Sequence, residues 1–113
     1  MTENKKLADY LESYHLGEKN AISSRELEHV FQIRGSELRK EVNSLRGADV
    51  PICSCDSGYY YAETEAELVH TIRQMQSRIK RIAFAERGLV RALEARMNTD
   101  QLRIPLDGGV TDE

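Results

Sequence analysis

The chain has 113 residues, of which 40% are hydrophobic and 31% charged, and its formal net charge is −3. This length allows one domain, or two at most, with a small hydrophobic core. No apolar run approaches the roughly 18 to 20 residues that a membrane span needs, and the polar start from Met1 to Lys6 lacks the apolar segment of a signal peptide. These features predict a cytoplasmic protein without a membrane partner.

The sequence carries no motif typical of an enzyme or a metal site. His15, His29 and His70 are isolated, and no Gly-rich phosphate loop, nucleophile elbow or paired-acid motif is present. Cys53 and Cys55 lie two residues apart in a predicted strand, a spacing that bridges poorly and offers too few metal ligands. We therefore expect free thiols, no catalytic residues, no metal and no cofactor.

A first helix is predicted over residues 2–16. Leu7, Ala8 and Leu11 recur at the spacing of one helical face, and Gly17 provides the stop. The short segment 21–23, centred on the β-branched Ile22, predicts a small strand.

Residues 23–46 predict two short amphipathic helices joined by a turn over residues 32–35. Ser23 and Glu26 have the spacing of a reciprocal capping pair, and Leu27, Val30 and Phe31 follow on one face.

In the second of these helices the apolar and polar residues separate onto two faces. Leu38, Val42 and Leu45 form an apolar stripe that is expected in the core together with residues such as Leu11, Leu27 and Val30. The opposite side carries Ser36, Arg39, Lys40 and Asn43.

A β-hairpin is predicted over residues 51–62, with its turn at Asp56, Ser57 and Gly58. Tyr60 falls on one face of the second strand, and Tyr59 and Tyr61 fall on the other. Either one set lies in the core and the other is free for a phosphate or for stacking, or all three tyrosines pack.

Two short helices followed by a compact hairpin resemble a winged helix-turn-helix. The resemblance covers residues 3–68 and is closest to the small winged-helix proteins of bacteria and their phages, in which a segment like "PI…S…GYY.A" forms the wing. It implies that the short strand at 21–23 pairs with the wing. It also implies sequence-specific binding of double-stranded DNA through the second helix, in transcription regulation or replication initiation. The DNA-binding residues expected from it are Arg34, Ser36, Arg39, Lys40, Asn43 and Arg46.

The charge distribution departs from this family in one respect. Residues 34–46 contain four basic and two acidic residues, whereas residues 49–67 contain five acidic residues and no Lys or Arg. A hairpin that binds phosphates normally carries Lys or Arg at its tip. A winged helix that docks protein instead of DNA is therefore the alternative interpretation.

The longest predicted element spans residues 64–97. Thr64 and Glu67 form a second capping pair, and helix formers follow except at Gly88. Apolar residues alternate at four and three positions, with Glu86 at one step where an apolar residue is expected, which is typical of a coiled coil. Either this helix forms a homodimer, or its second half folds back at Gly88 as a helical hairpin. The expected dimerisation residues are Ile72, Met75, Ile79, Ile82, Leu89 and Leu93.

Residues 98–113 predict a flexible tail because they are polar, contain glycine and proline, and lack periodicity. Within it, Gln101, Leu102, Ile104 and Leu106 are similar to the short peptides with which bacterial replication and repair proteins dock to the sliding clamp. The alternative is that this segment folds over a neighbouring chain. The sequence as a whole predicts an α+β chain with a winged-helix domain at 1–63, a long C-terminal helix at 64–97 and a tail at 98–113.

Overall fold

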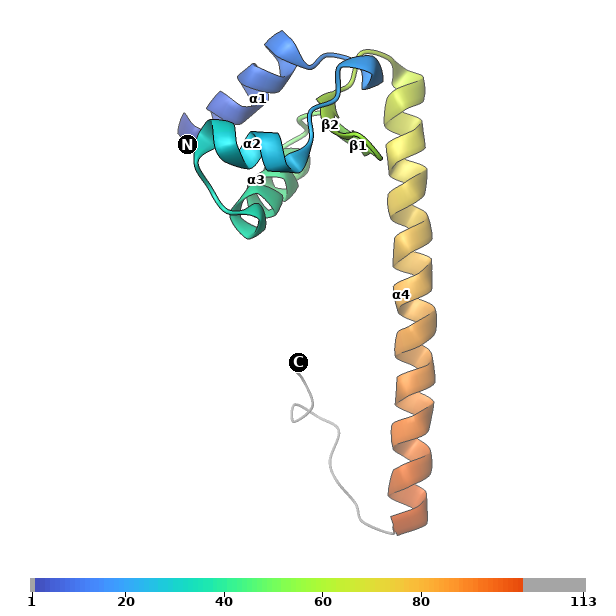
Figure 1. Cartoon of the computed structure of the whole chain (residues 1–113). Coiled ribbons are helices and arrows are strands. Elements are labelled where there is room, and N and C mark those ends of the chain that lie inside the picture. The colour runs from blue at the N-terminus through green and yellow to red at the C-terminus, as the bar shows by residue number, and fades with distance from the viewer. Residues whose placement is uncertain (1, 101–113) are drawn as a thin grey trace. The chain divides into compact units, whose positions relative to one another are not determined.

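The computed structural model describes residues 2–100. They form helices and one small sheet, and the predicted α+β class is confirmed (Figure 1). The chain divides into two compact units, Met1–Met75 and Gln76–Glu113, so the first turns of the last helix belong to the N-terminal unit. The elements in chain order are α1 (Thr2–Tyr14), a 3₁₀ helix η1 (Glu18–Asn20), α2 (Ser24–Phe31), α3 (Gly35–Gly47), β1 (Ile52–Cys55), β2 (Gly58–Tyr61) and α4 (Glu65–Asp100).

Helix α1 ends at Tyr14, two residues before the predicted end at Leu16. The chain leaves the helix there because the next backbone groups bond to β2. The Tyr61 N–H donates to the His15 carbonyl at 2.8 Å, and the Gly17 N–H donates to the Tyr61 carbonyl at 2.8 Å. Gly17 has a φ of 87°, a conformation that favours glycine and turns the chain toward η1.

Helices α2 and α3 form a tight corner. The Ser23 hydroxyl accepts the Glu26 N–H at 3.1 Å, so the Ser23 half of the predicted capping pair is confirmed. At the other end Gln32 adopts the left-handed conformation, with a φ of 55°, and the Ile33 N–H donates back to the Glu28 carbonyl at 3.1 Å. Gly35 is the first residue of α3 and not part of the turn as predicted, so the connection consists of residues 32–34 alone.

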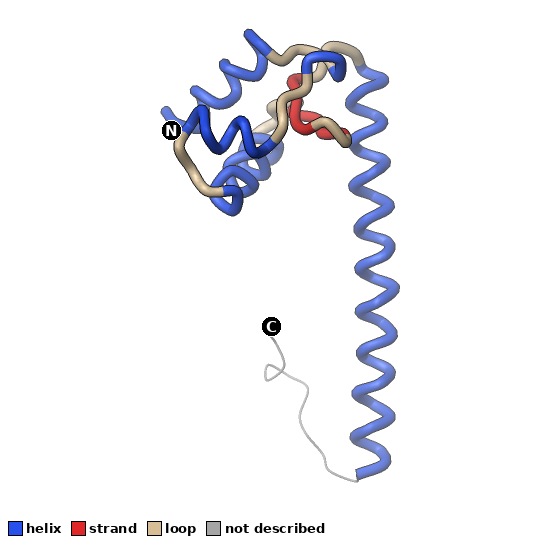
Figure 2. Tube along the Cα trace, in the orientation of Figure 1, coloured by secondary structure: helices blue, strands red, loops and turns tan. Residues whose placement is uncertain are grey.

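Strands β1 and β2 form an antiparallel hairpin in which Cys55 pairs with Gly58 across a two-residue loop (red in Figure 2). Ile22 joins its second strand: the Ile22 N–H donates to the Tyr59 carbonyl at 2.9 Å, and the Tyr59 N–H donates to the Ile22 carbonyl at 2.8 Å. The predicted pairing of the Ile22 segment with the hairpin is therefore confirmed.

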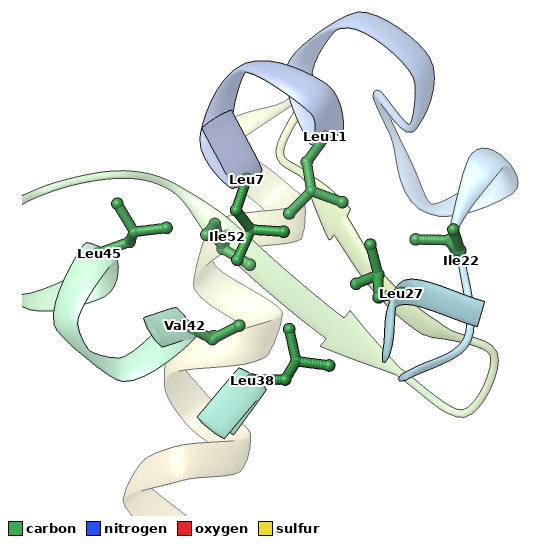
Figure 3. Packing of buried hydrophobic residues seen from close by; sticks show 8 residues of the cluster. All are labelled: Leu7, Leu11, Ile22, Leu27, Leu38, Val42, Leu45 and Ile52. Atoms are coloured by element: carbon green, nitrogen blue, oxygen red, sulfur yellow. The ribbon is translucent and has the colours of Figure 1, made fainter. Parts of the chain in front are cut away.

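The core of the N-terminal unit gathers side chains from α1, α2, α3, β1 and the Ile22 segment (Figure 3). Val30, expected in this core, is 46% exposed. Successive helical residues are about 100° apart, so Val30 turns outward while Leu27 and Phe31 face the core. The buried cluster consists of Leu7, Leu11, Ile22, Leu27, Leu38, Val42, Leu45 and Ile52.

The three consecutive tyrosines all pack within the N-terminal unit. Tyr60 is buried, while Tyr59 and Tyr61, on the other face of the strand, are half-buried against the core cluster. Of the two interpretations drawn from the sequence, packing of all three is the one the structure shows.

Helix α4 begins with the predicted capping pair. The Thr64 N–H donates to Glu67 Oε1, and the Glu67 N–H donates to Thr64 Oγ1, both at 3.2 Å. The helix continues through Gly88 without a break, so a helical hairpin at Gly88 is wrong. It also includes residues 98–100, which were predicted as tail. No helix within residues 2–100 is both long enough and apolar enough to cross a membrane.

Candidate functional site

The candidate nucleic-acid interface is the outward face of α3. Its helical period places Leu38, Val42 and Leu45 in the core, and this leaves the polar positions between them in solvent. Five of the six predicted DNA-binding residues are exposed on or directly before this helix: Arg34, Ser36, Arg39, Lys40 and Asn43.

The start of α3 combines cations with uncapped backbone donors. Arg34 is the N-cap residue, and its side chain makes no capping hydrogen bond. The Glu28 and Arg39 side chains both lie close to Gly35. A Cβ atom built on Gly35 would be 3.0 Å from Glu28 Oε2 and 3.6 Å from Arg39 Nη1. The face is therefore mixed in charge, with Glu37 also exposed among the cations. Such a surface can bind phosphate through Arg, Lys and the helix N-terminus, and can bind base edges through Arg, Lys and Asn.

Arg46 differs from the other predicted residues because it is half-buried. Its Nε donates to the Ile52 carbonyl at 2.8 Å, and its Nη2 donates to Ser54 Oγ at 3.3 Å. Arg46 thus links the end of α3 to strand β1. Nothing in the sequence spacing indicates this link from Arg46 to the hairpin. Contact of Arg46 with DNA stays a prediction.

The hairpin presents an acidic tip. Its loop residues Asp56 and Ser57 are exposed. Because residues 49–67 contain no Lys or Arg, the loop offers no cation to a phosphate.

A second surface is the apolar stripe of α4. Ile72, Ile79, Ile82 and Leu89 are exposed, with Ile79 at 63% and Leu89 at 72%, while Met75 and Leu93 are half-buried. Large apolar side chains with this much exposed area along one helix are typical of an interaction surface.

The first turns of α4 also form one wall of a pocket of about 460 Å³ within the N-terminal unit. Thr71 lies in this wall with its hydroxyl buried and without a hydrogen-bond partner among residues 2–100. No local sequence pattern indicates this pocket, because its walls come from segments far apart in the chain. The apolar lining residues are Val50, Pro51, Ile52, Leu68, Ile72 and Met75, and the polar ones are Arg46, Asp49 and Thr71.

Burial and hydrogen bonding perturb two titratable groups near the start of α4. Backbone N–H groups of Glu18, Glu63 and Thr64 donate to the Glu67 carboxylate and lower its pKa. Burial raises the pKa of the Tyr60 hydroxyl, and the neighbouring Cys53 adds to this effect. Cys53 is buried, Cys55 is half-buried, and both are free thiols. Tyr60 and Cys53 lie inside the N-terminal unit, and the half-buried Glu67 carboxylate caps the start of α4.

Within residues 2–100, no three His, Cys, Asp or Glu side chains gather in a way that could hold a metal ion. The predicted clamp-binding residues Gln101, Leu102, Ile104 and Leu106 lie outside the described residues. No family model, no curated protein and no solved structure matches the chain.

Proposed function

We propose that this chain is a sequence-specific double-stranded DNA-binding protein of bacterial or phage type, built on a winged helix-turn-helix and acting in transcription regulation or replication initiation. The observation that carries the proposal is the exposed face of α3, which groups Arg34, Arg39, Lys40 and Asn43 opposite a buried apolar stripe. The three-residue connection from α2 and the hairpin that follows α3 support it, because this order is that of a winged helix.

In this proposal α3 enters the major groove. Arg39 and Lys40 bind phosphate or guanine, and Asn43 binds adenine, as their hydrogen-bonding groups allow. Arg34 and Ser36 hold the phosphate backbone at the helix N-terminus. The acidic hairpin tip at Asp56 remains away from the backbone, since like charges repel.

The test is DNA affinity measured by fluorescence anisotropy as salt is varied, with fragments selected from a random library. Replacing Arg39 and Lys40 together by alanine is expected to weaken binding and to reduce the slope of log K against log salt by about 1.8, because each phosphate contact contributes about 0.9. The matched control replaces the exposed Lys6 and Lys19 by alanine, which removes the same charge from α1 and η1 and should leave the slope unchanged. A wild-type protein that binds no DNA at about 50 mM salt, where backbone attraction is strong, would overturn the proposal.

Dimerisation through α4 is the second part of the proposed function. The exposed stripe that includes Ile79, Ile82 and Leu89 would be covered by a second copy of the helix. Ile79→Glu places an unpaired carboxylate in that contact and should dissociate the dimer in sedimentation experiments. Phe84→Glu is the matched control, because Phe84 is equally exposed but lies off the stripe. A wild-type mass near the 12.9 kDa of one chain at micromolar concentration would contradict dimerisation.

The alternative function is a protein-docking adaptor that does not bind DNA. The acidic tip at Asp56 and the apolar pocket of the N-terminal unit favour it. In this alternative the partner is a replication protein, for example a sliding clamp held by residues 101–106. Capture of a partner from nuclease-treated lysate, together with the absence of DNA binding, would support the adaptor, whereas loss of all partners on nuclease treatment supports DNA binding.

A further inference from the structure

We infer that the two α4 helices of a homodimer pair antiparallel, in the register that places Glu86 of one chain beside the partner's Arg78. This inference rests on the proposed dimerisation and adds the direction and register of pairing. A second copy of α4 would cover both the apolar stripe and the pocket of the N-terminal unit.

The exposed apolar residues of α4 point to a single contact face. Helical positions three and four apart share a face, and on this basis all the exposed large hydrophobic residues of α4 except Phe84 fall on one side. Leu68, Ile72 and Met75, which line the pocket, hold positions of the same side by their spacing. Its exposed members are Val69, Ile72, Ile79, Ile82, Leu89 and Val90.

Glu86 lies in the middle of this face, and its charge separates the two directions of pairing. In a parallel, in-register pair each residue in the centre of the seam faces its own copy, so Glu86 would face the partner's Glu86 among apolar side chains. Arg78 lies at the margin of the face and would then face the partner's uncharged Ala83. Two carboxylates would be desolvated side by side without a cation, which is strongly unfavourable.

The antiparallel pair removes this conflict. Met75 packs against the partner's Glu86, and Arg78 lies one helical turn after Met75 on the same side. The guanidinium of Arg78 can therefore reach the partner's carboxylate. Two-fold symmetry repeats the contact, so both Glu86 residues gain a cation.

The same register matches apolar residues along the rest of the seam. Leu68 packs against the partner's Leu93, Ile72 against the partner's Leu89, and Ile79 against the partner's Ile82. At the margin Val69 faces the partner's Val90. Each contact joins two positions of the same face, so the face is complementary to itself.

The pocket lies where this register brings the partner's helix. Its α4 wall contains Leu68, Thr71, Ile72 and Met75, which are positions of the same face. Because the partner's Leu89 and Leu93 pass over Ile72 and Leu68, their side chains would enter the pocket.

Disulfide cross-linking tests the direction of pairing in the full-length protein. Ile72→Cys and Leu89→Cys are placed on separately tagged, co-expressed chains in which Cys55 is replaced by Ser and the fully buried Cys53 is retained. Mild oxidation should cross-link the Ile72→Cys chain to the Leu89→Cys chain and neither variant to itself. Phe84→Cys, off the face, should give no cross-link.

The outcomes separate this inference from the proposed function. Cross-linking of each variant to itself would show a parallel pair and overturn the inference while leaving dimerisation intact. A dimer by sedimentation that forms no cross-link would overturn the register. A monomeric wild type would overturn dimerisation and this inference together, and DNA affinity would still be measured separately.

A charge exchange gives a second readout. Arg78→Glu alone and Glu86→Arg alone each place like charges side by side and should raise the dimer dissociation constant about tenfold or more. The double variant restores the opposite charges and should return the constant to within about threefold of the wild type. A double variant weaker than both single variants would overturn the pairing of Arg78 with Glu86.

Discussion

The carboxylate of Glu67 accepts the backbone N–H of Glu18 at 3.0 Å, although 49 residues separate them in the chain. Its other oxygen accepts the N–H groups of Glu63 at 2.7 Å and Thr64 at 3.2 Å. One side chain therefore caps α4 and attaches the η1 segment to the start of that helix.

Replacing Glu67 by Gln should lower the free energy of unfolding by about 1 to 2 kcal/mol at pH 7, since hydrogen bonds to a charged acceptor are stronger than those to a neutral one. The hydrogen bonds hold the folded-state pKa of Glu67 below its ordinary value of 4.5. Its contribution is therefore complete above pH 4.5 and is lost as the pH falls through the folded-state pKa. Urea denaturation at pH 7 and pH 3 should show that the difference in the free energy of unfolding between wild type and variant is smaller at pH 3. Glu65→Gln, at an exposed position of the same turn, is the control and should change little.

Gly58 is expected to be intolerant of any side chain. Its φ is +134°, and a Cβ there would collide with the carbonyl of Ile22, the group that receives the Tyr59 N–H. Gly58→Ala should lower the free energy of unfolding by about 2 kcal/mol or more through backbone strain and loss of this pairing. Thermal unfolding checks this against Gly47→Ala, where a Cβ meets no atom within 4 Å. Equal stability of the two variants would contradict the close approach of Gly58 to Ile22.

Leu27 and Val30, both in α2, should respond very differently to truncation. Leu27 is fully buried, so Leu27→Ala removes core packing and should cost about 2 to 5 kcal/mol. Val30 is 46% exposed, and Val30→Ala also improves helix propensity, so the change in the free energy of unfolding should stay within about 0.5 kcal/mol. Chemical denaturation of both variants gives the comparison. A large decrease in the free energy of unfolding for Val30→Ala would show that Val30 is a core residue.

Thr71→Val should stabilise the protein slightly, by about 1 kcal/mol. The substitution keeps the branched shape and removes a buried hydroxyl that has no hydrogen-bond partner among residues 2–100. Thr71→Ser, which keeps the hydroxyl and removes the methyl group, should destabilise instead. Measurements at low protein concentration separate this effect from any effect on association. A destabilised Thr71→Val variant would indicate that the hydroxyl is hydrogen-bonded in solution.

Much of the fold could be predicted because its determinants are local. The caps at Ser23 and Thr64 and the hairpin turn before Gly58 depend on residues three or four apart. The pairing of Ile22 with the hairpin was expected from the resemblance to a winged helix and from the β-branched side chain.

The features missed from the sequence depend on how separate elements meet. Val30 has the right spacing for a core residue, and its exposure is decided by the direction from which α1 and α3 approach α2. Glu67 was recognised as a cap, but its bond to Glu18 joins segments that no local pattern connects. The pocket beside α4 was missed for the same reason, because it combines the α3–β1 connection with Leu68, Ile72 and Met75.

The bond from Arg46 to the Ile52 carbonyl also bears on how the protein behaves at high concentration. A short hairpin exposes backbone groups on both outer edges, and such groups can recruit strands from other molecules and start aggregation. Here the outer edge of β2 is occupied by Ile22 and by the bonds of Tyr61 to His15 and Gly17, and Arg46 occupies a carbonyl of β1. The arginine thus leaves one acceptor fewer on the outer edge of β1 for pairing with a strand of another molecule.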